Sequence, residues 1–95
     1  MEYIAFIHNN TNNDTKNEQW HSFFLLATDS GIFQGGSEIY NSEAIGKKLV
    51  PNINKNIDGF MRFETDDKEK LLLLLEKHPV IIEGGSLELC EISKR

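Results

Sequence analysis

The chain has 95 residues, of which 39% are hydrophobic and 26% charged, and its net charge is −5 at pH 7. This length fits one domain over residues 1–95. A chain this short has a modest core, and such proteins are often stabilised by pairing with a second copy. Lysine and arginine are scattered along the chain, which argues against a nucleic-acid partner. No apolar run is long enough to cross a membrane, and the start Met1-Glu2-Tyr3 lacks the basic segment of a secretory signal, so we expect a cytoplasmic protein.

The first third of the chain predicts a strand, a polar loop and a helix. Residues 3–8 are aromatic and β-branched, as strands prefer, and residues 9–17 are turn formers with nothing to bury. Thr15 and Glu18 have the spacing of a capping box, so we expect a helix over about 16–30. One face of this helix carries the apolar residues Trp20, Phe23, Phe24 and Ala27.

Two further strands follow, joined by a long connection. Gly31 is placed to end the helix in the left-handed conformation, and a second strand is expected over 31–40. The mixed, polar stretch 41–57 predicts a long connection, with a short helical turn at 42–48. Residues 59–64 predict a third strand.

The last third predicts a helix and a strand. Asp66 and Glu69 repeat the capping-box spacing, and Pro79 is expected to stop the helix that they begin. Residues 80–92 then predict the last strand, interrupted by a glycine pair. The apolar face of this helix carries Leu71, Leu74 and Leu75.

Two similar phrases show an internal repeat: "FQGGSEI" at 33–39 and "IEGGSLEL" at 82–89. Their Gly-Gly-Ser triplets begin at 35 and 84, 49 residues apart, and the same offset carries 18–30 of the first predicted helix onto 67–79 of the second. The order β-α-β-β-α-β predicts an α+β, ferredoxin-like fold, an antiparallel four-stranded sheet with two helices on one face. Because Gly-Gly inside a strand favours a bulge that bends it, we expect a curled sheet whose bare face pairs with a second copy in a homodimeric, dimeric α/β barrel.

Sequence patterns indicate no metal and no cofactor. Cys90 is the single cysteine, so no disulfide can form within the chain, and its apolar surroundings favour a small buried side chain over a reactive thiol. No spacing of cysteine and histidine indicates a metal site. Neither Gly-Gly-Ser triplet is followed by the Gly-Lys-Ser/Thr of a phosphate loop.

Alternation along the predicted strands divides the side chains between two faces of the sheet. Arg62 is suited to hold an anionic or carbonyl-bearing ligand in a partly enclosed pocket on the face without helices. The alternative is an ion pair of Arg62 with Glu38 or Glu88, across the sheet or the dimer interface. If the more apolar side chains meet the helices, this face carries Gln34, Glu38, Phe60, Arg62, Glu88 and Cys90.

Several stretches resemble the YCII-related family, also named for its DGPF sequence. They are "EYIAFIH", "SGIFQGGSEI", "DGFMRFETDDKEKLLLLLEKHPVIIEGG" and "LELCEI", and the resemblance covers most of the chain from Trp20 onward. It implies a small dimeric α/β-barrel protein, similar to enzymes that act on chlorinated aromatic or lactone-like compounds. Those enzymes use a histidine on the first helix and an aspartate just before the proline that ends the second.

This chain departs from that pattern at both positions. His78 stands before Pro79 in place of the aspartate, and the first-helix position falls on His21 or, with an offset of one residue, on Trp20. A histidine near the carboxyl end of a helix interacts well with the helix dipole, and with a raised pKa it could act as acid or base. Asp58 begins an Asp-Gly-Phe stretch similar to the family's DGPF. The catalytic candidates are His78, His21 and Asp58, and the ligand-binding candidates are Arg62, Glu38, Glu88, Phe60 and Trp20.

The sequence leaves two functions open. The leading interpretation is a protein of the YCII-related type that binds a small organic ligand. Such a protein could also be a small enzyme of the lyase or isomerase type that uses acid–base chemistry. The alternative is a non-catalytic interaction or regulatory module built on the homodimer. An open cavity favours the first, and a face filled by Phe60 and its neighbours favours the second.

Overall fold

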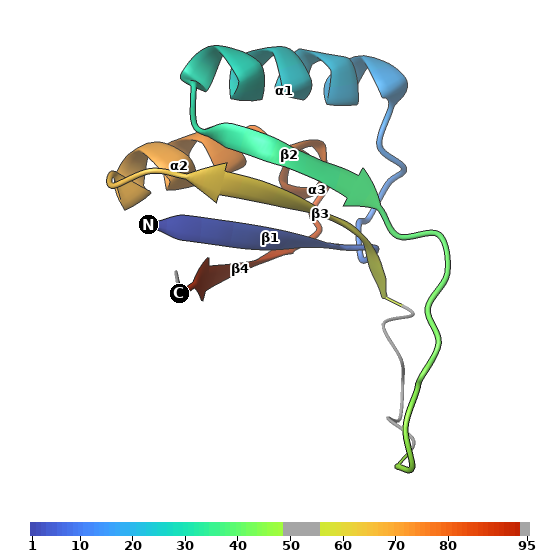
Figure 1. Ribbon diagram of the computed structural model, residues 1–95. Helices are drawn as coiled ribbons and strands as arrows, with labels where there is room; N and C mark the ends of the chain where they lie inside the picture. The colour runs from blue at the N-terminus through green and yellow to red at the C-terminus, as the bar shows by residue number, and fades with distance from the viewer. Residues whose placement is uncertain (49–55, 94–95) are drawn as a thin grey trace.

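The computed structural model describes residues 1–48 and 56–93 (Figure 1). Within these ranges no helix is both long and apolar enough to span a membrane. The elements follow the predicted order, with one additional short helix near the end. They are β1 (Glu2–His8), α1 (Asn17–Ser30), β2 (Phe33–Glu38), β3 (Ile57–Glu64), α2 (Lys68–Leu75), α3 (Pro79–Ile82) and β4 (Leu87–Ile92).

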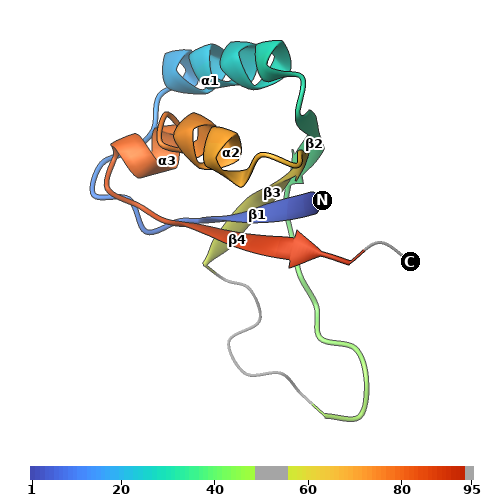
Figure 2. The ribbon, with the colours of Figure 1, turned by 90° about the vertical axis from the view of Figure 1, so that its left-hand side faces the viewer.

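The four strands form one antiparallel sheet in the order β2-β3-β1-β4. Figure 2 shows all three helices on one side of this sheet and the other side bare. This is the predicted α+β, ferredoxin-like arrangement, which the structure confirms.

The core lies between the sheet and the helices and follows the alternation of the strands. Every second residue of β1 is buried, and these residues meet the buried faces of α1 and α2. The core residues are Tyr3, Ala5, Ile7, Phe23, Ala27, Ile32, Met61, Phe63, Leu71, Leu75 and Val80.

Helix α1 begins one residue later than the capping spacing of Thr15 and Glu18 predicts. Lys16 precedes its first turn, and the Gln19 Oε1 atom accepts a hydrogen bond from the Lys16 backbone N–H at 2.7 Å. The Thr15 hydroxyl instead accepts a hydrogen bond from the Trp20 indole at 2.9 Å, so it is not available as a cap. The helix ends as predicted at Gly31, which has a φ of 75°.

The predicted second helix is shorter than expected, and the strand predicted over 80–92 starts too early, because a further short helix, α3, occupies Pro79–Ile82 and β4 begins only at Leu87. The Asp67 carboxylate, one residue after the expected Asp66, caps α2 by accepting from the Lys70 N–H at 3.1 Å, and α2 ends at Leu75. Pro79 does not stop this helix but begins α3, because proline lacks an N–H and therefore suits the first position of a helix. His78 becomes the N-cap of α3.

The two Gly-Gly-Ser triplets are not equivalent, contrary to the repeat. Gly35 and Gly36 lie inside β2, where the pairing with β3 shifts register as a bulge does. Gly84 and Gly85 lie in the turn before β4, not inside the strand, and Gly84 has a φ of 84°. Cβ atoms at these two glycines would meet the side chains of Asn12 and of its neighbours in the polar loop, so the second triplet receives that loop.

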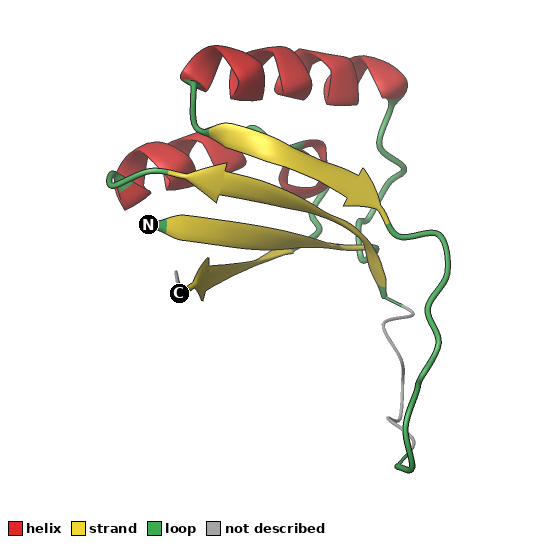
Figure 3. Ribbon diagram, viewed as in Figure 1, coloured by secondary structure: helices red, strands yellow, loops and turns green. Residues whose placement is uncertain are grey.

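The connection after β2 leaves the body of the molecule (Figure 3). The predicted helical turn at 42–48 does not form. Among the described residues Ile45 is 90% exposed and is not part of the core, while Gly46 has a φ of 123°. The rest of the predicted connection includes 49–55, which lies outside the described residues.

Candidate functional site

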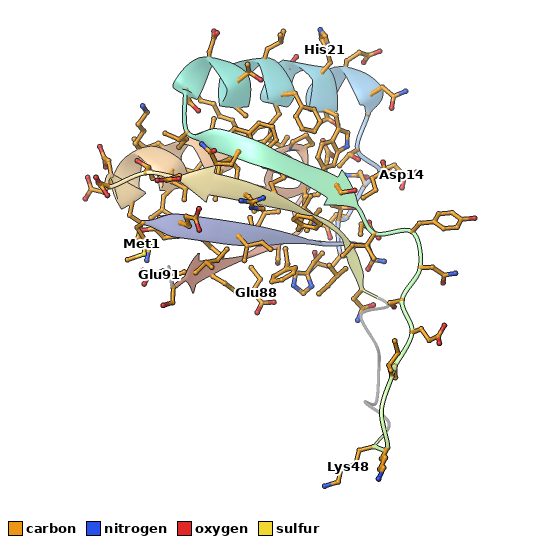
Figure 4. The ribbon with its side chains drawn as sticks, in the orientation of Figure 1. Met1, Asp14, His21, Lys48, Glu88 and Glu91 are labelled. Carbon is orange, nitrogen blue, oxygen red and sulfur yellow. The ribbon has the colours of Figure 1, made fainter. Side chains whose placement is uncertain are left out.

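A cavity of about 950 Å³ lies where the polar loop, the first turns of α1 and the ends of β2 and β3 meet. The loop enters this site through Asp14, which Figure 4 shows beside the end of β2. Five aromatic residues, Trp20, Phe24, Phe33, Tyr40 and Phe60, and three acidic ones, Asp14, Glu38 and Asp58, contribute to its lining.

Aromatic rings form one wall of the cavity. Trp20 and Phe24 are one helical turn apart on α1, with ring centroids 6.0 Å apart, and Phe24 lies 6.0 Å from Phe33 at the start of β2. The Phe24 side chain is left partly exposed at this wall. A small apolar or aromatic ligand could therefore bury surface against these rings.

Trp20 is held in place from two sides. Its indole Nε1–H donates to the Thr15 hydroxyl, and its ring lies edge-on to the His78 imidazole with centroids 4.9 Å apart. Trp20, and not His21, is therefore the first-helix candidate that lies beside His78. His21 is exposed and points away from the sheet on the outer side of α1 (Figure 4).

His78 is fully buried, and burial lowers its pKa from 6.5 to about 4. The expectation of a raised pKa at a helix carboxyl end was wrong, since His78 lies at the amino end of α3. Its Nδ1 accepts a hydrogen bond from the Val80 N–H at 3.1 Å, so the proton of the neutral ring is on Nε2. Among the described residues that Nε2–H has no hydrogen-bond partner, and the ring packs against Phe23 at 4.7 Å.

Trp20 and His78 therefore form a contacting pair between α1 and the start of α3. Neither member can exchange a proton with the cavity as they stand. The Trp20 N–H is donated to Thr15, and His78 is neutral at pH 7 and 0% exposed. His78 caps α3 and Trp20 packs against it, whereas the acidic residues of the cavity lining are Asp14, Glu38 and Asp58.

Glu38 reaches the cavity because of the bulge in β2. Simple alternation predicted Glu38 on the bare face of the sheet, beside Arg62. The inserted residue shifts the register, so that Glu38 pairs with Gly59, and Gly59 pairs with the buried Ile7. Glu38 consequently belongs to the row that faces the helices, and Asp58, at the start of β3, also contributes to the cavity lining.

The bare face of the sheet carries the other candidates. Arg62 is exposed there, and in the described part of the chain it forms no ion pair with Glu38 or Glu88. Glu88 instead contacts the His8 Nε2 at 3.1 Å, and in Figure 4 it points away from the helices. The structure thus splits the predicted site. Trp20, Glu38 and Asp58 line the cavity, and His78 lies behind Trp20. Arg62, Glu88 and Cys90 lie on the bare face, and Phe60 belongs to that face by its position in β3 while it also borders the cavity.

Sequence reasoning missed the contribution of the polar loop, because its residues have no pattern of burial. The loop is held by the second Gly-Gly-Ser triplet. Asn10 accepts from the Ser86 N–H at 2.9 Å through its Oδ1, and the Asn12 N–H donates to the Glu83 carbonyl at 2.8 Å. The signal that could have revealed this contact is the glycine pair Gly84-Gly85, because a glycine pair can mark a place where another segment approaches closely.

The described residues hold no group of three or more histidine, cysteine, aspartate or glutamate side chains that could bind a metal ion.

Comparison with known proteins shows a similarity of fold. No family model matches the chain, and no curated protein matches it by sequence. The solved structure of 5-chloro-2-hydroxyhydroquinone dehydrochlorinase (TftG) from Burkholderia phenoliruptrix AC1100, in complex with 2,5-dihydroxybenzoquinone, is similar with a TM-score of 0.58 and 9% identity, over 98% of this chain and 94% of that one. The chain thus has a fold like that of this dehydrochlorinase.

Proposed function

We propose that this protein binds a small organic molecule in the cavity between α1 and the ends of β2 and β3. The observation that carries the proposal is the lining itself, a wall of partly exposed aromatic rings next to carboxylates, in a cavity of about 950 Å³. Small-molecule sites typically combine such an apolar surface with a few polar groups that fix orientation. We further propose one domain over residues 1–95 that belongs to the YCII-related family.

The similar structure supports a ring-shaped ligand. The dehydrochlorinase holds 2,5-dihydroxybenzoquinone, and its fold extends over almost the whole of this chain. A ring of that size fits against Trp20, Phe24 and Phe33, whose centroids follow one another at 6.0 Å.

Any acid–base step in this cavity would use the carboxylates of Asp14, Glu38 or Asp58. His78 is not suited to that role, because its Nδ1 is occupied by the Val80 N–H and the ring is shielded by Trp20 and Phe23. Binding without turnover is therefore the function that the geometry supports best.

A thermal-shift screen of small ring compounds, 2,5-dihydroxybenzoquinone included, tests the proposal. We expect at least one compound to raise the melting temperature, and calorimetry should then give its affinity for the parent chain and two variants. Trp20→Phe removes the indole ring from the cavity wall, and Arg62→Ala changes the bare face. The proposal expects weaker binding to Trp20→Phe and unchanged binding to Arg62→Ala.

The reverse result would place the ligand on the bare face and would contradict the proposed site. Glu38→Gln provides an independent check, because Glu38 is exposed and its substitution does not threaten folding. A library without a single binder would refute the function itself.

The bare face of the sheet favours a second function, a homodimeric interaction module. Ile4 and Phe6 of β1 are only half-buried there, next to Arg62 and Phe60 of β3. A second copy could cover this face and form an α/β barrel. Sedimentation at micromolar concentration tests this, since a monomeric mass contradicts it and a dimer that the variant Phe6→Glu dissociates supports it.

A further inference from the structure

We propose that the ligand of the cavity is an organic cation, a protonated amine carried on a small aromatic or aliphatic group. This inference rests on the proposed function and specifies the ligand class of the same site. It follows from the charge of the lining, from its aromatic wall and from the absence of competing ion pairs.

The charged side chains of the lining are all of one sign. Asp14 comes from the polar loop, Glu38 from the end of β2 and Asp58 from the start of β3, so three separate segments contribute an acidic residue to the cavity lining. None of the described lining residues is a lysine or an arginine. His8 also lines the cavity, but its Nε2 lies 3.1 Å from the Glu88 carboxylate, which offsets any positive charge on that ring.

In the described part of the chain, no lysine, arginine or histidine forms an ion pair with these carboxylates. Within residues 1–48 and 56–93, the ion pairs join the amino terminus to Asp66, His8 to Glu88 and Lys68 to Glu91. Asp14, Glu38 and Asp58 take part in none of them. A cationic ligand would therefore gain these attractions without first breaking an ion pair of the protein.

The amino end of α1 is the one feature of the lining that favours an anion. It reaches the cavity through Asn17, and a helix end carries a partial charge of roughly half a unit. Three carboxylates outweigh it, and Asp14 lies in the segment that leads directly into that helix end. The net charge of −5 adds to the attraction for cations at longer range.

The aromatic wall suits the same ligand class. Trp20 is the most favourable side chain for cation–π contact, and Phe24 and Phe33 continue the wall beside it. A cation–π contact and a partly exposed ion pair together correspond to a preference of about tenfold for a cation over a neutral molecule of the same shape.

Trp20 also provides the measurement, because it is the single tryptophan of the chain and lines the cavity. Its fluorescence should be titrated with three molecules of matched shape: 2-phenylethylamine, 2-phenylethanol and phenylacetate. We expect the amine to bind about tenfold more tightly than the alcohol and the acid to bind most weakly. High salt should weaken binding of the amine and leave the alcohol unchanged.

Three variants test whether the preference for the amine arises in the cavity. Glu38→Gln and Asp58→Asn should each weaken the amine severalfold without changing the affinity for the alcohol. Asp29→Asn removes the same charge from the exposed last turn of α1, outside the cavity lining, and should change neither affinity.

Equal affinity for amine and alcohol, or a preference for the acid, would overturn the cationic ligand and leave the proposed function standing. If Asp29→Asn reduces the preference for the amine as much as Glu38→Gln does, the preference comes from the net charge of the protein, and the inference is overturned as well. Failure of all three molecules at millimolar concentration also overturns it, whereas the proposed function depends on the separate library screen.

Discussion

Protonation of the buried His78 should destabilise the protein as the pH falls. The pKa of His78 is lowered from 6.5 to about 4 by burial, so between these values the unfolded chain binds a proton that the folded chain excludes. Stability therefore rises with pH across this window and is lost as the pH falls from about 6.5 towards 4. The full effect is about 3 kcal/mol, of which about 2 kcal/mol is already lost at pH 5.

Urea unfolding at several pH values between 8 and 5 measures this effect, with the variant His78→Asn as the reference. Asparagine can still accept a hydrogen bond from the Val80 N–H but does not titrate. The parent chain should lose about 2 kcal/mol more than His78→Asn over this range, which is about 10 °C in melting temperature for a domain of this size. The control His21→Asn changes an exposed ring and should retain the pH dependence of the parent.

Parallel pH curves for the parent and His78→Asn would refute this reasoning. So would an NMR titration in which the His78 ring takes up its proton near pH 6.5.

Two further substitutions test the glycine-rich segments. Gly36→Ala would place a Cβ against the Phe60 carbonyl and the Met61 Cα, which are backbone atoms that cannot rotate away, so it should lower the free energy of unfolding in urea by about 2 kcal/mol. The control Ser37→Ala changes the exposed neighbouring residue and should lower it by less than about 0.5 kcal/mol. Equal stabilities of the two variants would show that β2 and β3 do not approach so closely. Asn10→Ala removes the hydrogen bonds to the Ser86 N–H and hydroxyl and should cost about 1 kcal/mol while speeding hydrogen exchange at Ser86. Unchanged exchange at Ser86, compared with the exposed control Asn13→Ala, would mean that the loop is held by other contacts.

The fold could be predicted from the sequence because local rules dominate it. Alternation placed Arg62 on the bare face of the sheet, between residues that face the helices, and the need for a positive φ placed Gly31 at the end of α1. The order of strands and helices then admitted the ferredoxin-like sheet, which the structure confirms.

The site was harder to predict because it depends on single-residue offsets and on contacts between distant segments. One inserted residue in β2 moved Glu38 from the bare face to the cavity, and proline at the start of α3 made His78 a buried cap. The position of Asp14 depends on a loop held from the other end of the chain, through Asn10 and Ser86. Periodicity along one segment contains none of this information.

The location of the ligand is the central claim, and NMR of the amide-labelled protein tests it most directly. A titration with 2-phenylethylamine, or with the best binder from the screen, should shift the Trp20 indole N–H and the backbone N–H signals of Gly36 and Gly59, which lie at the cavity. Signals of Arg62 and Cys90, on the bare face, should stay in place. Shifts at Arg62 and Cys90 with a stationary Trp20 indole would contradict the account.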